Sequence, residues 1–268
     1  MTVTIGQREL LAALGGAVAW PLAARAQQRE KMRHIGVLVP AASNDPAFQA
    51  RVGAFLQGLA VLEWSIGRNV RVDARWAITD AAEIRRHAAE LVALAPDVIL
   101  AHGTTTLGRL RQVSRTVPTV FTSVADPVGS GFVESMARPG GNATGFIAFE
   151  FSISGKWLEL LKEIAPGVTR AVVLRDAEVG SGASQFAVIQ ALAPSLRVEV
   201  NPVSVDSTAE IERAVEAFAR APNGGLIASG GSRVRFHRDL IVKLAAHNKL
   251  PAVYYDRIFV DSGGLIWA

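Results

Sequence analysis

The sequence contains no cysteine, and this absence excludes several kinds of chemistry at once. A chain without thiols forms no disulfide, holds no metal through thiolate ligands and has no cysteine nucleophile. We also expect no lipid anchor of the kind that is attached to an N-terminal cysteine. The absence leaves the compartment open, because oxidising compartments permit disulfides without requiring them.

Neither sign of charge dominates the chain, which has 28 basic and 24 acidic residues and a net charge of +4. The basic residues are also scattered along the sequence, as Arg111, Arg115 and Lys243 illustrate. A nucleic-acid-binding protein usually gathers its basic residues into one stripe. We therefore predict no nucleic-acid partner.

Motifs for nucleotide binding and for hydrolysis are missing. The turn after the first expected strand, residues 39–44, contains no glycine, whereas a dinucleotide-binding fold carries G-x-G-x-x-G there. There is also no Walker A motif, no G-x-S-x-G and no H-E-x-x-H. The five histidines lack metal-ligand spacing, and we expect His102 to be neutral and hydrogen-bonded. These absences predict no cofactor, no metal site and no enzymatic activity.

The N-terminal segment is typical of a secretory signal peptide. Residues 10–19 form an apolar run that is too short to remain as a membrane-spanning helix. An A-x-A cleavage pattern, Ala-Arg-Ala, follows at residues 24–26. The alternative is a buried N-terminal helix, which Gly15 and Pro21 would weaken. We predict cleavage after Ala26 and a periplasmic location.

From residue 34 onward, apolar runs typical of strands alternate with amphipathic segments typical of helices. The first series places strands at residues 34–39, 70–76, 97–101 and 117–121. Asp45 and Asp80 stand where N-caps of the intervening helices are expected. A break rich in glycine and proline follows, with a short helix expected between residues 129 and 139.

A second series begins with a strand at 144–149. Further strands are expected at 171–174, 198–203, 225–228 and 252–255, and helices at 155–164, 185–192, 208–220 and 234–247. Repeated βαβ units imply parallel sheets with right-handed crossovers. The predicted fold class is therefore α/β, with two Rossmann-like lobes and a ligand cleft between them.

Ligands of open parallel sheets bind beyond the carboxyl ends of the strands. The loops at those ends are rich in small polar residues, which orient ligands by hydrogen bonds, although the same residues also cap helices. The candidate ligand-binding residues that we select, partly from the resemblance described next, are Ser43, Asn44, Thr104, Thr105, Asp126, Arg175, Asp176, Tyr255 and Arg257.

Several stretches carry a resemblance to a known family. The most specific are Ala-Asp-Pro-Val-Gly-Ser-Gly-Phe-Val at 125–133 and Ala-Arg-Pro-Gly-Gly-Asn-Ala-Thr-Gly at 137–145. Others lie at 35–38, 63–70, 89–99 and 156–166. Residues 33–268 thereby resemble the ABC transporter substrate-binding proteins related to the tryptophan/phenylalanine-binding group, which have the type I periplasmic-binding fold.

The resemblance implies a protein that closes on a small solute, an amino acid or an aromatic or organic acid, and hands it to an ABC permease in the inner membrane. We expect a monomer. The implied organisation is a first lobe at 33–143, a second lobe at 144–262 and the start of a crossover back to the first lobe at 263–268. Relatives continue through a helix and a strand that complete the first lobe.

The resemblance also suggests individual roles. Thr104 matches a ligand-facing threonine, Asp126 lies in the D-P-V-G motif on the hinge side, and Arg257 could pair with a ligand carboxylate or form a surface ion pair. Two features of the sequence depart from the family pattern. Paired arginines of the leader are replaced by Gln7 and Arg8, and an acidic ligand position is replaced by glycine at 230–231.

Two other function classes stay open. A ligand-sensing domain of a receptor or regulator shares this fold but needs a DNA-binding or signalling segment, and no helix-turn-helix fits in residues 1–32. An enzyme is the third interpretation, and the missing catalytic motifs argue against it.

Overall fold

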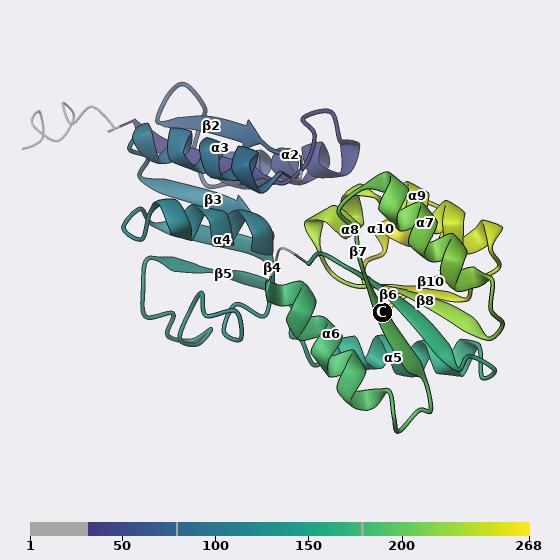
Figure 1. The fold of residues 1–268 in the computed structure, drawn as a ribbon. Coiled ribbons are helices and arrows are strands. Elements are labelled where there is room, and N and C mark those ends of the chain that lie inside the picture. Colours follow the sequence, from purple (N-terminus) through teal and green to yellow (C-terminus); the bar gives the residue numbers. More distant parts are fainter. Residues whose placement is uncertain (1–31, 79, 178–179) are drawn as a thin grey trace, which may run out of the picture.

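Two α/β lobes lie side by side in the computed structural model, which describes residues 32–78, 80–177 and 180–268 (Figure 1). The predicted signal peptide and its cleavage position after Ala26 lie outside the described residues and stay predictions. Within the described ranges, no helix is long and apolar enough to cross a membrane.

The sheet of the first lobe has the strand order β2-β1-β3-β4-β5, and all its strands are parallel. The strands are β1 Arg33–Val39, β2 Val70–Trp76, β3 Val98–His102, β4 Thr119–Ala125 and β5 Ala143–Phe149. The strands β1 to β4 lie at or near the predicted apolar runs. A central strand of a parallel sheet is buried on both faces, and this burial explains the continuous apolar run of β1, whereas the edge strand β2 alternates polar and apolar residues.

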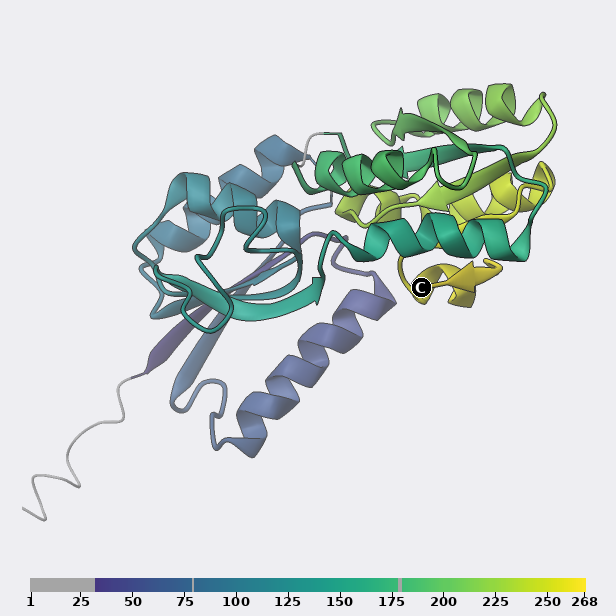
Figure 2. The same ribbon diagram turned by 90° about the horizontal axis from the view of Figure 1, so that it is seen from below.

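Helices cover both faces of this sheet. Helix α2 (Pro46–Val61) packs on one face, whereas α3 (Ala81–Ala93) and α4 (Thr104–Val113) pack on the other (Figure 2). The predicted caps are confirmed, since Asp45 accepts hydrogen bonds from the first turn of α2 and Asp80 does so for α3. Proline at the first position of α2 has no amide hydrogen, and none is needed there.

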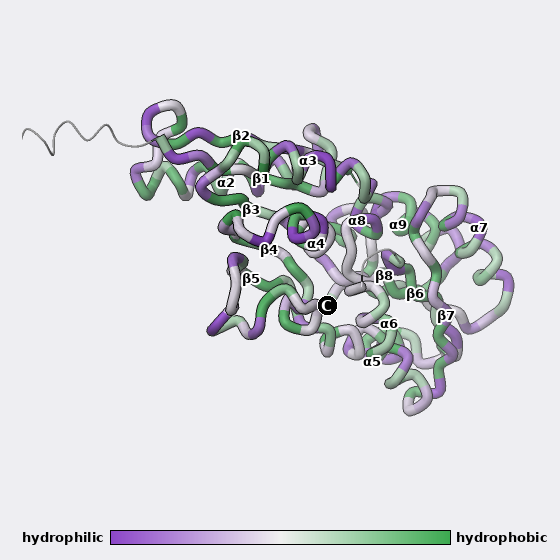
Figure 3. Tube along the Cα trace, turned by 60° about the vertical axis from the view of Figure 1, so that its left-hand side comes forward, coloured by the Kyte–Doolittle hydropathy of each residue, from purple (hydrophilic) through white to green (hydrophobic). Residues whose placement is uncertain are grey.

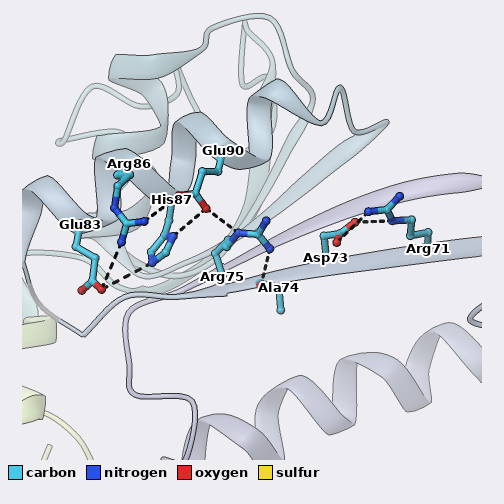
Figure 4. Close-up of polar contacts among 8 residues, drawn as sticks. All are labelled: Arg71, Asp73, Ala74, Arg75, Glu83, Arg86, His87 and Glu90. Carbon is cyan, nitrogen blue, oxygen red and sulfur yellow. Dashed lines mark hydrogen bonds and ion pairs between the residues drawn. The ribbon is translucent and has the colours of Figure 1, made fainter.

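A polar network ties α3 to the neighbouring strand β2 (Figure 4). The carboxylate of Glu90 accepts hydrogen bonds from Arg75 of β2 and from Arg86 one helical turn earlier, each at 2.9 Å. His87 lies between Glu83 and Glu90 on the same helix face. The hydrogen bond from Arg75 is the largest cause of the lowered pKa of Glu90. The network orients α3 on the sheet, although partly exposed ion pairs stabilise a fold only slightly.

The second lobe repeats this construction, with the parallel strand order β10-β9-β8-β6-β7. Its strands are β6 Arg170–Arg175, β7 Glu199–Ser204, β8 Gly224–Ala228, β9 Ala252–Tyr254 and β10 Ile266–Trp267. Its helices are α5 Ile153–Ile164, α6 Gly180–Leu192, α7 Thr208–Ala219, α8 Ser232–Phe236, α9 Arg238–His247 and α10 Ile258–Asp261.

Two hydrophobic cores sandwich the second sheet. One core joins α5 and α6 to one face, and the other joins α7, α8, α9 and α10 to the opposite face. Figure 3 shows hydrophobic residues along the central strands and hydrophilic residues mainly in outer loops and on helix surfaces. Burying these apolar faces is the main favourable term in folding. The cores also hold the carboxyl ends of the strands in fixed positions facing the first lobe.

Three expectations about organisation differ from the structure. Residues 144–149, expected to open the second lobe, belong to β5, which pairs with β4 in the first sheet. Residues 263–268, expected to begin a crossover to the first lobe, contain β10, which pairs with β9 in the second sheet. No helix forms in the described residues between 129 and 139, where successive turns bond the backbone locally, for example from Phe132 N to Pro127 O.

The single helix expected at 234–247 is also wrong, because the structure divides it into α8 and α9. His237 separates them, with φ −89° and ψ 14°. The short helix α8 follows β8 after a glycine-containing loop, and its residues Ser232 and Arg235 line the cleft between the lobes, whereas α9 packs in the hydrophobic core of the second lobe. The apolar spacing of this segment continues across the break, so periodicity alone did not reveal it.

Candidate functional site

A cleft of about 360 Å³ lies between the lobes, at the carboxyl ends of strands from both sheets. The first lobe contributes residues of β3, β4, β5 and the first two turns of α2, and the second contributes residues that follow β8 and β9. This is where the topology of open parallel sheets places ligand sites. The volume is that of a pocket for a small organic molecule.

Two arginines reach this cleft from opposite lobes. Arg51 comes from α2, and Arg235 comes from α8. Their guanidinium carbons lie 5.0 Å and 5.5 Å from the centre of the Phe48 ring. Burial, and then the positive charge of Arg235, lowers the pKa of Arg51 to about 10. The cleft therefore holds two cationic groups in close proximity.

Arg235 is held by its own lobe. Its guanidinium forms an ion pair with Asp256, and its Nε donates to the hydroxyl of Tyr255 at 3.2 Å. The residue is only 9% exposed, and its Nη1 is buried without a hydrogen-bond partner. A buried cationic donor that lacks a partner carries a desolvation cost, which an acceptor atom of a ligand would relieve. Arg235 is thus a largely buried cation whose position its own lobe fixes.

His102, at the end of β3, is the neutral side chain that its sequence position suggested. Its Nε2 lies 3.1 Å from a guanidinium nitrogen of Arg51, which can only donate, so Nε2 accepts. Nδ1 then carries the proton and donates to Thr122 Oγ1, also at 3.1 Å. Burial, and then the charges of Arg51 and Arg235, lowers the pKa of His102 to about 3. The imidazole fixes the guanidinium of Arg51 without adding charge.

Aromatic side chains form the apolar walls of the cleft. Phe48 and Phe149 come from the first lobe, and Tyr255 and Trp267 come from the second. Phe149 packs edge-on against Tyr255, with ring centres 6.2 Å apart, across the boundary between the lobes. Flat apolar walls beside cationic donors suit a ligand that has an anionic group and an apolar or aromatic body.

The comparison with known proteins agrees with this architecture. The family model for ABC transporter substrate-binding proteins matches residues 34–267. The chain belongs to that family. A curated relative, the tyrosine-binding protein of Clostridioides difficile strain R20291, is 25% identical over 244 residues, which cover 88% of this chain and 67% of the relative.

Solved structures share the fold of this substrate-binding protein. A conserved domain protein from Vibrio cholerae has a TM-score of 0.78 at 25% identity, over 88% of this chain and 78% of that one. A Streptococcus pneumoniae domain in complex with L-Trp has a TM-score of 0.77 at 22% identity, over the same shares. The predicted fold class, two Rossmann-like lobes of the type I periplasmic-binding kind, is confirmed.

Three of the selected candidates line the cleft of the substrate-binding protein: Thr104, Tyr255 and Arg257. Thr104 Oγ1 accepts a hydrogen bond from Ala125 N at 3.0 Å, which leaves its hydroxyl hydrogen available to a ligand. The side chain of Arg257 is 75% exposed and lies 3.6 Å from Asp261 one turn along, so it stands at the rim of the cleft.

The other candidates near the first sheet lie elsewhere. Ser43 and Asn44 are exposed in the loop before α2. Thr105 is buried on the side of α4 that faces a second, polar groove. Asp126 closes its own turn, because its Oδ1 accepts from Gly129 N at 2.7 Å and its φ is +37°. The structure therefore gives Asp126 a role in shaping the D-P-V-G loop, outside the residues that line the cleft.

Arg175 and Asp176, at the end of β6, also lie outside the lining of the cleft. The guanidinium of Arg175 lies 5.7 Å from the centre of the Phe186 ring on α6. Asp176 is 2% exposed and lies behind Gly231, where an added Cβ would approach its side chain to 3.2 Å. The loop after β6 therefore supports the cleft from behind.

Sequence reasoning missed the residues that carry the charge and much of the wall: Phe48, Arg51, Phe149, Arg235 and Trp267. Arg51 stands on a helix, and Arg235 is one of the basic residues that are scattered along the sequence. One available signal was position, because Arg235 follows the end of β8 within a few residues, where ligands of such sheets bind. No feature of the local sequence marks Arg51 as a cleft residue, and only the tertiary structure shows it.

Proposed function

We propose that this protein captures a small solute with a carboxylate group between its two lobes and delivers it to an ABC permease for import. The observation that carries the proposal is the convergence of Arg51 and Arg235, from different lobes, on one cleft with aromatic walls. Charge-assisted hydrogen bonds from guanidinium to carboxylate are among the stronger polar contacts in proteins.

The placement of one arginine on each lobe couples binding of the ligand to closure of the two lobes. A carboxylate held by both guanidinium groups links the first lobe to the second and neutralises their mutual repulsion. The unpartnered Nη1 of Arg235 supports this role, because its lobe leaves that donor unsatisfied. A permease that recognises the closed form would then receive loaded protein in preference to empty protein.

Two relatives support a ligand that combines a carboxylate with an apolar part. One is named a tyrosine-binding protein and another was crystallised with L-Trp, and both of these ligands carry a carboxylate and an aromatic ring. Phe48, Phe149 and Tyr255 supply matching walls here. The size of the cleft also favours a single small molecule over a peptide or an oligosaccharide.

Isothermal titration and thermal unfolding of the purified protein test the proposal. The panel contains aromatic and aliphatic carboxylates, amino acids, neutral sugars and amines. A ligand that binds only the native state raises the melting temperature, and at one ligand concentration a tighter ligand raises it more, so carboxylates should stabilise the protein and neutral sugars and amines should not. Binding confined to sugars or amines would contradict the proposal.

Export and import need separate tests. We propose that the chain is exported and cleaved after Ala26, which N-terminal sequencing of the periplasmic fraction would check. Uptake of the labelled ligand by cells with and without the gene tests the role in import. Uncut protein confined to the cytoplasm, or uptake that does not depend on the gene, would contradict these two steps.

A further inference from the structure

We infer that the ligand is a carboxylate without an ammonium group, that is, a deaminated organic acid instead of an α-amino acid. The inference rests on the proposed function and narrows it, because it adds to the carboxylate requirement a statement about the rest of the ligand. The inferred ligand of this chain therefore differs from tyrosine, for which one relative is named, and from the L-Trp with which another was crystallised.

The first observation is the lack of an available carboxylate. Among the described residues that line the cleft, Asp256 is the only acidic one. Its carboxylate is already engaged, since it forms the ion pair with Arg235 and accepts a hydrogen bond from Ile258 N at 3.0 Å. An ammonium group buried without an anionic or well-placed polar partner carries a large desolvation cost.

The second observation is that three neutral acceptors of the cleft already receive hydrogen bonds. His102 Nε2 accepts from Arg51, and the hydroxyl of Tyr255 accepts from Arg235. Thr104 Oγ1 accepts from the backbone of β4. Two of their hydrogens are also used, since His102 Nδ1 donates to Thr122 Oγ1 and the Tyr255 hydroxyl donates to Gly231 O, so of the three only Thr104 keeps an O–H donor for the cleft. Each of the three acceptors is already engaged, so none of them is a ready partner for an ammonium group.

The third observation is the balance of charge. The lining contains the guanidinium groups of Arg51, Arg235 and Arg257 and the single carboxylate of Asp256. The positive field is strong enough that Arg235 contributes to the lowered pKa of Arg51. An ammonium group would enter this field at an electrostatic cost, whereas a plain carboxylate gains from it.

The fourth observation concerns the end of β8, where the chain has glycine at 230–231. A Cβ at Gly230 would stand 2.4 Å from the ring of Phe149, so the aromatic wall occupies the space that a side chain would need. Three nearby acids lie outside the cleft lining, and one of them, Asp176, is 2% exposed behind Gly231. Asp45 caps α2 and lies 3.5 Å from Arg238, and Asp126 caps its own turn.

Matched ligand pairs test the inference on the unmodified protein. The pairs are 3-phenylpropanoate with phenylalanine, and 3-(4-hydroxyphenyl)propanoate with tyrosine, each measured by isothermal titration. We expect the deaminated member to bind at least about tenfold more tightly, since tenfold corresponds to about 1.4 kcal/mol. Equal or tighter binding of the amino acids overturns the inference and leaves the proposed function intact. Failure of every carboxylate, with binding of amines, overturns the proposed function itself.

A variant pair tests the physical reason. Ser232 lines the cleft at the start of α8, where an acidic residue is favourable to the helix. Ser232→Asp supplies the missing carboxylate, and Ser232→Asn has the same shape without the charge. We expect the affinity for phenylalanine relative to 3-phenylpropanoate to rise about tenfold in Ser232→Asp compared with Ser232→Asn. An unchanged ratio between these two variants overturns the inference.

Discussion

Arg51 and Arg235 approach each other across the interlobe cleft, and their guanidinium carbons lie 5.0 Å and 5.5 Å from the centre of one phenyl ring. That ring, Phe48, is 4% exposed and also packs edge-on against His102 at 5.2 Å. Two cations from different lobes over one aromatic surface repel each other unless an anion lies between them. The predictions below test the parts of this arrangement separately.

Replacing Arg51 with methionine should weaken binding of a carboxylate ligand by about 10- to 100-fold. The reason is the loss of a charge-assisted hydrogen bond, which contributes roughly 1.5–3 kcal/mol. Isothermal titration of parent and variant measures the change. Arg213→Met is the matched control, because Arg213 is exposed on α7 and lines none of the cleft. Parent-like affinity in Arg51→Met would remove this residue from the site.

Replacing Arg257 with alanine should weaken the same ligand less than Arg51→Met does. The side chain of Arg257 is 75% exposed, so water competes for its donors and screens its charge. Titration of the two variants under one set of conditions compares them. A larger loss in Arg257→Ala would make this residue the main anchor, which is the ligand-pairing alternative that the sequence left open for it.

Replacing Arg235 with methionine should lower the free energy of unfolding by roughly 3 kcal/mol, because it leaves the carboxylate of Asp256 without its ion-pair partner. Combining Arg235→Met with Asp256→Asn should recover much of that loss, since the unpaired charge is removed. Urea unfolding of the parent, both single variants and the double variant gives the coupling energy. Strictly additive losses would show that the ion pair does not couple the two residues.

Thr104→Val should lower the free energy of unfolding by about 1–3 kcal/mol in the absence of ligand. The change removes the acceptor for Ala125 N and leaves a backbone donor unpaired between α4 and β4. Thr104→Ser keeps the acceptor and should retain most of the stability. Urea unfolding of the three proteins is the measurement, and equal losses in the two variants would contradict the assignment.

The loss of folding stability at acid pH should depend on His102. Its pKa is lowered to about 3 in the folded protein, whereas an unfolded histidine titrates near the ordinary value of 6.5. Below about pH 6.5 the unfolded chain therefore binds the proton more readily, and stability falls progressively toward pH 3. His102→Gln removes this term, so its stability deficit relative to the parent should shrink as the pH falls from 7 to 4. A deficit that stays constant or grows over that range in urea unfolding would contradict the assignment.

Much of the local structure could be predicted from particular residues. The apolar run that begins at His34 folds as β1, and Asp45 with Pro46 begins α2, because caps and buried strands depend on neighbouring residues. The break between α8 and α9 could not be predicted in this way. It depends on where the segment after β8 turns away from the cleft, and the apolar spacing on both sides of His237 is continuous.

The sequence by itself determined the two series of alternating strands and helices, hence the parallel sheets, and the general position of the site at their carboxyl ends. Only the tertiary structure decided which side chains meet there. Arg51 and Arg235 lie far apart in the chain and on helices of different lobes, and local patterns carry no information about their distance. The two arginines come close together because of how the two packed lobes face each other. The same packing places the ring of Phe149 against Gly230, where a larger residue would not fit.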